Sequence, residues 1–149
     1  MLRTALEGGF QDRILTRLIT AYKERCQILC DVLASEPRIR VFLKPTGGYF
    51  VWVEFANLSA AGTSSDVGSA PEDPASRFAR YCAGHGLKVM PGTKCDLVPD
   101  DFLQSEQPRD LCHNAVRLCF ADMDRDDVEA GARRLIELYR AYVVENTGT

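Results

Sequence analysis

The stretch from Tyr49 to Phe55 constrains the fold more than any other part of this sequence of 149 residues. Its residues are aromatic or β-branched at nearly every position, which is typical of a strand. Successive side chains of a strand point to opposite faces. One face would carry Tyr49, Val51, Val53 and Phe55, and the other Phe50 and Trp52. Because both faces are apolar, we expect this strand to be covered on both sides.

A second strand is expected immediately before it. Residues Ile39 to Leu43 are rich in branched and aromatic side chains, and the intervening Pro45-Thr46-Gly47-Gly48 has the composition of a turn. The two glycines allow positive φ and a close approach of the backbone. We therefore predict a hairpin.

Two helices are predicted from periodicity and from their end signals. Between Gln11 and Leu33 apolar residues recur at offsets of three and four, which indicates one amphipathic helix, and Glu36-Pro37 ends it. Asp73 suits the N-cap of a second helix and Pro74 its first position. Gly84 or Gly86 would stop that helix.

Two short strands and a last helix complete the pattern. The strands are expected at Leu87–Met90 and Ala115–Phe120, and the helix starts at Asp124, with Met123 and Val128 placed for a hydrophobic staple. The order helix, hairpin, helix, strand, strand, helix predicts an α+β fold. We expect a small mixed or antiparallel sheet of about four strands packed against helices.

The length predicts a single domain over residues 1–149. Small polar residues at 59–70 predict a flexible insertion, and 94–113, with two prolines, a long loop. A net charge of −3 with scattered basic residues argues against nucleic-acid binding. No apolar run reaches the roughly 18 residues of a membrane span, and the N-terminus lacks a signal-peptide core. We expect a cytoplasmic protein whose six cysteines are reduced.

Cysteine and histidine spacing predicts no metal site. The close pairs are Cys26 with Cys30, Cys82 with His85, and Cys112 with His113. None forms the Cys-x-x-Cys unit of structural zinc sites. On the apolar stripe of a helix, cysteine acts as a small hydrophobe. The histidines also lack a neighbouring nucleophile motif, which argues against a hydrolase.

Arg117 is the residue best placed for chemistry. In its strand it shares a face with the small side chains of Ala115 and Cys119, which leave room for an anion. The planar guanidinium suits a bidentate pair with a carboxylate. From spacing alone, an arginine on a solvated strand face remains the alternative interpretation.

Four motifs occur in a fixed order along nearly the whole chain. They are Tyr22-x-x-Arg25, Pro45-x-Gly47-Gly48-Tyr49-Phe50-x-Trp52, Gly86-Leu87-x-Val89-x-Pro91-Gly92, and Val116-Arg117-Leu118-x-Phe120 followed by Glu129-x-Gly131. In this order the chain resembles the C-terminal small domain of fold-type I, class I/II aminotransferases that use pyridoxal phosphate. The aminoadipate/kynurenine aminotransferase and MocR-like branch is the most similar.

The resemblance implies a substrate-binding role for Arg117, which would hold the α-carboxylate, and for Gly47, Gly48 and Tyr49. It implies amino transfer between an amino acid and a 2-oxo acid by a homodimeric enzyme. In the family, the large domain precedes this region and supplies the Schiff-base lysine, the pyridinium carboxylate and the phosphate cradle. We therefore expect no catalytic, cofactor-binding or metal-binding residue here, and no activity or bound cofactor for this chain alone.

One departure and one alternative function accompany the resemblance. Cys95 stands where the family usually has an aromatic residue after Pro-Gly, so the resemblance says less about the shape of the substrate pocket. The alternative function is a standalone, non-catalytic interaction domain that retains the fold. In that case Phe50 and Trp52 would face a partner.

Overall fold

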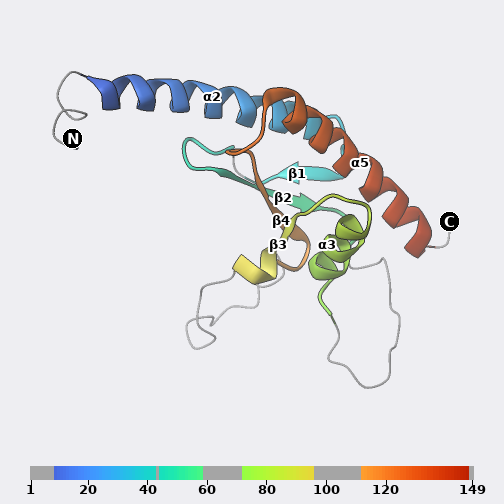
Figure 1. The fold of residues 1–149 in the computed structure, drawn as a ribbon. Coiled ribbons are helices and arrows are strands. Elements are labelled where there is room, and N and C mark those ends of the chain that lie inside the picture. The colour runs from blue at the N-terminus through green and yellow to red at the C-terminus, as the bar shows by residue number, and fades with distance from the viewer. Residues whose placement is uncertain (1–8, 43, 59–71, 96–111, 148–149) are drawn as a thin grey trace, which may run out of the picture.

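The computed structural model describes residues 9–42, 44–58, 72–95 and 112–147. In chain order its elements are α2 (Phe10–Leu33), β1 (Ile39–Val41), β2 (Phe50–Phe55), α3 (Pro74–Gly84), β3 (Met90–Pro91), the 3₁₀ helix η1 (Gly92–Cys95), β4 (Ala115–Cys119) and α5 (Arg125–Thr147) (Figure 1). The expected insertion at 59–70 and most of the expected loop at 94–113 lie outside the described residues.

The strands form one antiparallel sheet in the order β1-β2-β4-β3. This confirms the predicted α+β fold with a small sheet packed against helices. In the register of β2 and β4, Trp52 lies opposite Arg117 and Val53 opposite Val116. Because β4 is central in the sheet, its side chains have neighbours on both flanks.

The third strand differs from the prediction of a strand at 87–90. Only Met90 and Pro91 pair with β4. The amide of Leu87 donates instead to the carbonyl of Cys82, which closes the end of α3, and Gly86 adopts a φ of 82° there. Pro91 has no amide to donate, so it is confined to an edge strand. The backbone at Leu87 therefore closes α3 and does not pair in the sheet.

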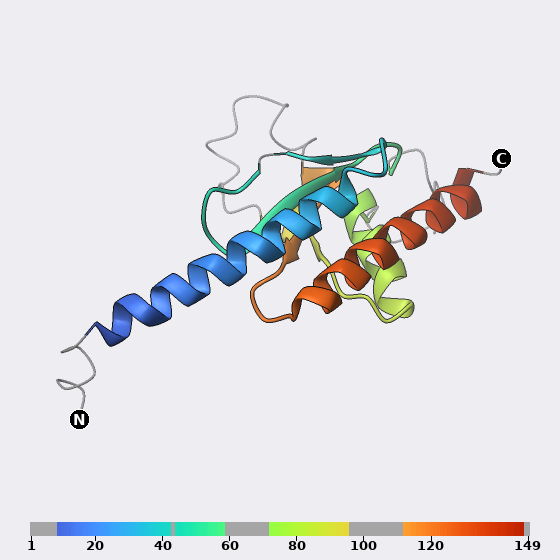
Figure 2. The ribbon, with the colours of Figure 1, turned by 90° about the horizontal axis from the view of Figure 1, so that it is seen from above.

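The three helices bury one face of the sheet. The buried side chains on this face of β2 and β4 are Val51, Val53, Phe55, Val116 and Leu118. The ring of Phe55 lies 5.0 Å from those of Phe78 in α3 and Tyr139 in α5. The Tyr139 hydroxyl donates to the carbonyl of Ala56 at 2.5 Å. Figures 1 and 2 show α2 and α5 side by side over this face.

The other face of the sheet is less well covered than we expected. Phe50 is 39% exposed and Trp52 is half-buried. The prediction that β2 is covered on both sides is therefore wrong for Phe50 in this structure. The physical reason is that the buried side chains of all three helices pack against the sheet face that carries Val51.

The helix ends follow their sequence signals closely. Asp73 accepts a hydrogen bond from the amide of Ser76 at 2.9 Å, as expected of an N-cap before Pro74. The amide of Val128 bonds to the carbonyl of Asp124, the predicted start of α5. No helix within the described residues is long and apolar enough to cross a membrane.

A buried carboxylate links the end of α2 to α5. Glu36 is 3% exposed and accepts hydrogen bonds from Arg38 Nε at 2.8 Å and Arg140 Nε at 2.7 Å. The hydrogen bond from Arg38, with that from Arg140, lowers the pKa of Glu36 to about 2 although burial opposes the shift. This contact joins residues far apart in the sequence.

Candidate functional site

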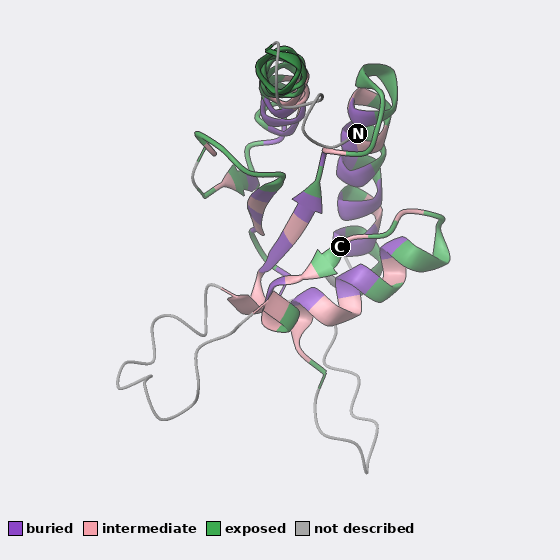
Figure 3. Ribbon diagram, turned by 60° about the vertical axis from the view of Figure 1, so that its left-hand side comes forward, coloured by how far each residue is buried: buried purple, intermediate pink, exposed green. Residues whose placement is uncertain are grey.

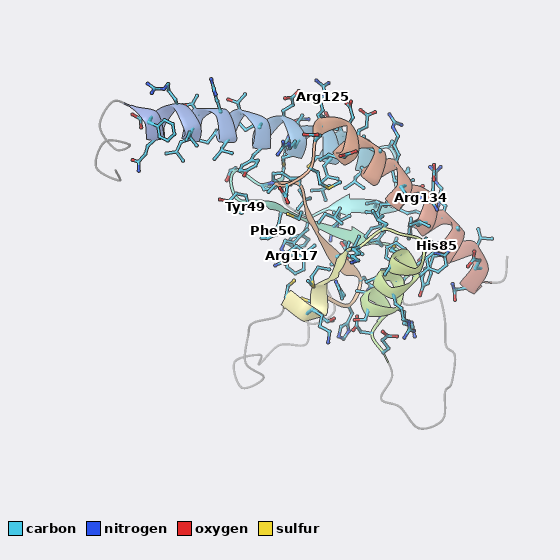
Figure 4. The ribbon with its side chains drawn as sticks, viewed as in Figure 1. Tyr49, Phe50, His85, Arg117, Arg125 and Arg134 are labelled. Atoms are coloured by element: carbon cyan, nitrogen blue, oxygen red, sulfur yellow. The ribbon has the colours of Figure 1, made fainter. Side chains whose placement is uncertain are left out.

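Arg117 lies at the centre of β4, on the sheet face that the helices leave open. It pairs with Trp52 of β2 on one flank and with Met90 of β3 on the other. Its guanidinium carbon lies 4.1 Å from the centre of the Phe50 ring, a cation–π contact. The arginine is therefore half-buried and its orientation is fixed by an aromatic surface (Figure 4).

The guanidinium of Arg117 has hydrogen-bonding capacity that the described residues do not use. It makes no hydrogen bond or ion pair with another described residue. Of the two β4 residues that share its face, Ala115 is buried and small, and Cys119 is exposed. Apolar surroundings reduce the local dielectric and strengthen an ion pair formed there. This geometry is compatible with an anion at Arg117, and the substrate-binding role expected for it stays a prediction.

Gly92 shows why Pro91-Gly92 is more than a turn. A Cβ at this position would lie 2.6 Å from the carbonyl oxygen of Cys112 and 3.1 Å from Cζ3 of Trp52. These distances leave no room for a larger residue. The glycine lets η1 pack tightly beside Trp52, which in turn lies next to Arg117 on the open face.

The hairpin turn forms a second, adjoining area. Gly48 has a φ of 85°, which explains the glycine at this position. Together with Gly47, Tyr22 and Lys23 it lines a cavity of about 430 Å³ under α2. Tyr49 is 51% exposed, and its ring meets that of Tyr22 edge-on at 5.3 Å.

Phe50 connects the two areas, and sequence reasoning gave it no role beside Arg117. Its ring lies 6.4 Å from Tyr49 on one side and contacts Arg117 on the other. No described contact joins Arg117 directly to Gly47 or Gly48. Phe50 is a diagonal neighbour of Arg117 across the two strands, so the register of β2 and β4 is needed to find it.

Arg25 also has a definite place. Its Nη1 donates to the carbonyl of Ala121 at 2.6 Å, and its guanidinium lies 6.0 Å from the ring of Tyr22. The Tyr22-x-x-Arg25 motif thus fixes α2 to the residues that follow β4. Its role in the described structure is to position the helix over the sheet.

Comparison with known proteins gives a consistent set of neighbours. Over 137 residues, 91% of this chain, the sequence is 27% identical to a 2-aminoadipate transaminase of Thermus thermophilus, and covers 28% of that protein. The crystal structure of an α-aminoadipate aminotransferase of Thermus thermophilus, complexed with N-(5'-phosphopyridoxyl)-L-leucine, matches 97% of this chain with a TM-score of 0.64 at 20% identity, over 31% of its own length. A kynurenine aminotransferase of Pyrococcus horikoshii gives 0.60 at 19% identity, covering 92% of this chain and 28% of that one.

No protein-family model matches the sequence. The chain spans less than a third of the length of the aminotransferases just described. Its fold is the small-domain fold of the aminotransferases. The neighbours in both sequence and structure are pyridoxal phosphate enzymes, and the partial coverage agrees with a C-terminal small domain.

Of the cavities in the described part of the chain, those at Lys23, Lys44 and Lys88 do not offer pyridoxal phosphate all the groups it needs. The cofactor needs a lysine amine, a carboxylate at the ring nitrogen and donors around the phosphate. The lysines of the chain are Lys23, Lys44, Lys88 and Lys94. The cavity beside Lys23 has no carboxylate in its walls. In the cavity beside Lys44, Glu36 is already paired with two arginines and Asp31 accepts a hydrogen bond from Gln27. Lys88 lies near Asp122, but the other side chains around them are apolar apart from Cys119.

Three of the six cysteines, Cys26, Cys30 and Cys82, are buried and pack as apolar side chains. Burial raises the pKa of Cys82 to about 12. Burial, assisted by the neighbouring Cys26, raises the pKa of Cys30 to about 11. These thiols stay protonated at neutral pH, which disfavours metal binding and nucleophilic attack. Among the described residues, no three His, Cys, Asp or Glu side chains are grouped to hold a metal ion.

Proposed function

We propose that this chain is the C-terminal domain of a pyridoxal phosphate aminotransferase, in which Arg117 binds the α-carboxylate of the substrate. The observation that carries the proposal is the position of the Arg117 guanidinium. Its carbon lies 4.1 Å from the centre of the Phe50 ring, and no described residue forms a hydrogen bond or ion pair with it. A fixed, half-buried arginine discriminates carboxylates by bidentate geometry. Its fold supports the proposal independently, because structures of this fold include aminotransferases.

The rest of the proposed enzyme would lie outside this chain. The cofactor would supply the chemistry of moving an amino group between an amino acid and a 2-oxo acid. A preceding large domain would hold it, in a cytoplasmic homodimer. The exposed Phe50 and the open sheet face around Arg117 would then border the substrate. Gly47, Gly48 and Tyr49 would contact it from the turn.

The decisive test is Arg117→Lys in the intact enzyme. We expect KM for the amino acid to rise and kcat to fall, with kcat/KM lowered about 100-fold, because one ammonium cannot rebuild a bidentate contact. Arg40→Lys is the matched control. Arg40 lies on the same sheet face but is already paired with Glu54. An unchanged kcat/KM in Arg117→Lys would remove Arg117 from the site.

A second experiment tests where the cofactor is held. The chain is mixed with pyridoxal phosphate, reduced with borohydride and analysed by absorbance and mass. We expect no stoichiometric adduct on any of its four lysines. A single lysine labelled to completion would show that the chain binds the cofactor itself. In that case the division of roles between two domains would be wrong.

A further inference from the structure

An apolar cavity lies on the covered side of the sheet, away from Arg117. Its volume is about 330 Å³, and it opens between the segment 87–89 and the residues that follow β4. Leu29, Leu118, Val128 and Leu135 form its walls. All four side chains are at most 9% exposed, so the walls belong to the hydrophobic core. The cavity is a gap in that core that opens to the surface.

The size of the cavity suits a small ligand. It lies at the lower end of the roughly 300–1,000 Å³ typical of small-molecule sites. A dry apolar cavity of roughly 150 Å³ is enough for a benzene ring. One aromatic or branched aliphatic side chain would therefore fit, with room for a short polar head at the opening.

The charges at this cavity are of both signs. Lys88 and Asp122 line it, and both residues are exposed. Neither makes an ion pair or hydrogen bond with another described residue. An ammonium and a carboxylate beside one apolar cavity complement a zwitterion with an apolar tail. A fatty acid would use only the lysine, and an amine only the aspartate.

We propose that this cavity is a binding site for a free α-amino acid with an apolar side chain. The side chain enters the cavity, the α-carboxylate pairs with Lys88 and the α-ammonium pairs with Asp122. Leu118, at the cavity wall, and Arg117 point to opposite faces of the same strand. The site is therefore distinct from the proposed carboxylate site and does not depend on it.

Gly131 provides a way to close the cavity without unfolding the chain. It lines the cavity from α5, and a Cβ there would lie 3.8 Å from Cε of Met123, an ordinary contact. Leucine is also a better helix former than glycine. We therefore expect Gly131→Leu to fill the cavity and keep the fold. Gly84→Leu is the matched control, since a Cβ at Gly84 meets nothing within 4 Å.

The experiment titrates the complete chain with L-phenylalanine and follows amide chemical shifts by NMR. We expect saturable shifts at residues lining the cavity. Phenethylamine, which lacks the carboxylate, and 3-phenylpropanoate, which lacks the ammonium, should each bind about fivefold more weakly. Glycine should bind at least about fiftyfold more weakly, because no apolar group is buried. Lys88→Met and Asp122→Asn should each lower the affinity for phenylalanine about fivefold. Lys23→Met and Asp12→Asn are the controls and should leave the affinity unchanged.

The outcomes separate this site from the proposed function. Loss of binding in Gly131→Leu, with Gly84→Leu and Arg117→Lys unaffected, supports the cavity site. The proposal is overturned if no saturable shift appears up to about 20 mM phenylalanine, a limit that still detects weak binding. Equal binding of the two singly charged analogues and phenylalanine would also overturn it. Binding that is lost in Arg117→Lys and kept in Gly131→Leu would reject the cavity and leave the proposed function standing.

Discussion

The two halves of α2 have the same apolar periodicity but differ in solvent exposure. From Cys26 to Leu33 the stripe is buried, and the side chain of Leu33 is fully inaccessible to solvent. From Phe10 to Thr20 every residue is exposed, including Leu15 at 55%. Figure 2 shows this first half, the projecting half, extending beyond the sheet, and Figure 3 shows its exposed turns.

The difference shows what an amphipathic pattern can and cannot predict. The pattern indicates that a helix has an apolar face, because residues three and four apart lie on one side. It does not say which surface covers that face. The covered half meets the sheet of this chain. In the proposed enzyme the projecting half would meet a surface contributed by the rest of the protein.

The largest test of this comparison is a pair of leucine truncations. Leu33→Ala should lower the free energy of unfolding by about 3 kcal/mol, because it leaves a cavity in the packed core. Leu15→Ala should change it by less than about 0.5 kcal/mol, because its side chain has no packed surroundings to lose. Urea denaturation followed by circular dichroism measures both. Similar losses for the two variants would mean that the projecting half is packed in solution.

Sequence reasoning was most successful where the signal is local. It placed the first helix at residues 11–33 and the structure has Phe10–Leu33. Asp73 and Pro74 predicted a helix start because capping involves only residues three positions apart. The strand expected at 87–90 was wrong, because the amide of Leu87 is used to close α3.

Contacts between distant residues were the part that could not be predicted. Glu36 follows a helix and has the sequence context of a turn residue before proline, yet it is paired with Arg140, 104 residues later. Likewise, Arg117 was singled out from its neighbours along the strand, but its contact with Phe50 depends on the strand register. The roles proposed for Gly47, Gly48 and Tyr49 remain predictions.

The second test asks whether the covered half is also anchored by charge. The pKa of Glu36 lies at about 2 in the folded chain, below its ordinary value of 4.5, chiefly through the hydrogen bond from Arg38. As pH falls, the unfolded state therefore binds the proton first. The stabilisation is complete above about pH 4.5 and disappears as pH falls toward 2. We expect it to be about 2 kcal/mol, since both arginines are partly exposed to screening solvent.

Denaturation at several pH values measures this contribution. Glu36→Gln should remove about 2 kcal/mol at pH 7 and flatten the dependence of stability on pH between 4.5 and 2. Glu24→Gln is the matched control, since Glu24 pairs with Arg125 at 2.8 Å on the surface. Its effect should stay below about 0.5 kcal/mol. An unchanged acid profile in Glu36→Gln would show that α2 is anchored by apolar packing alone.

Polar substitutions in the projecting half should have the smallest effect on stability. They test the comparison by changing the self-association of the chain instead. The exposed apolar residues there are Phe10, Ile14, Leu15, Leu18 and Ile19. A stripe of this kind is a contact surface, so the isolated chain should self-associate. The double substitution Leu15→Ser and Ile19→Ser should raise the dissociation constant at least about tenfold while changing stability by less than about 0.5 kcal/mol. Arg17→Ser, on the same half, should leave association unchanged. Sedimentation equilibrium over a range of concentrations measures both, and a parent chain that stays monomeric throughout would show that this stripe needs no partner.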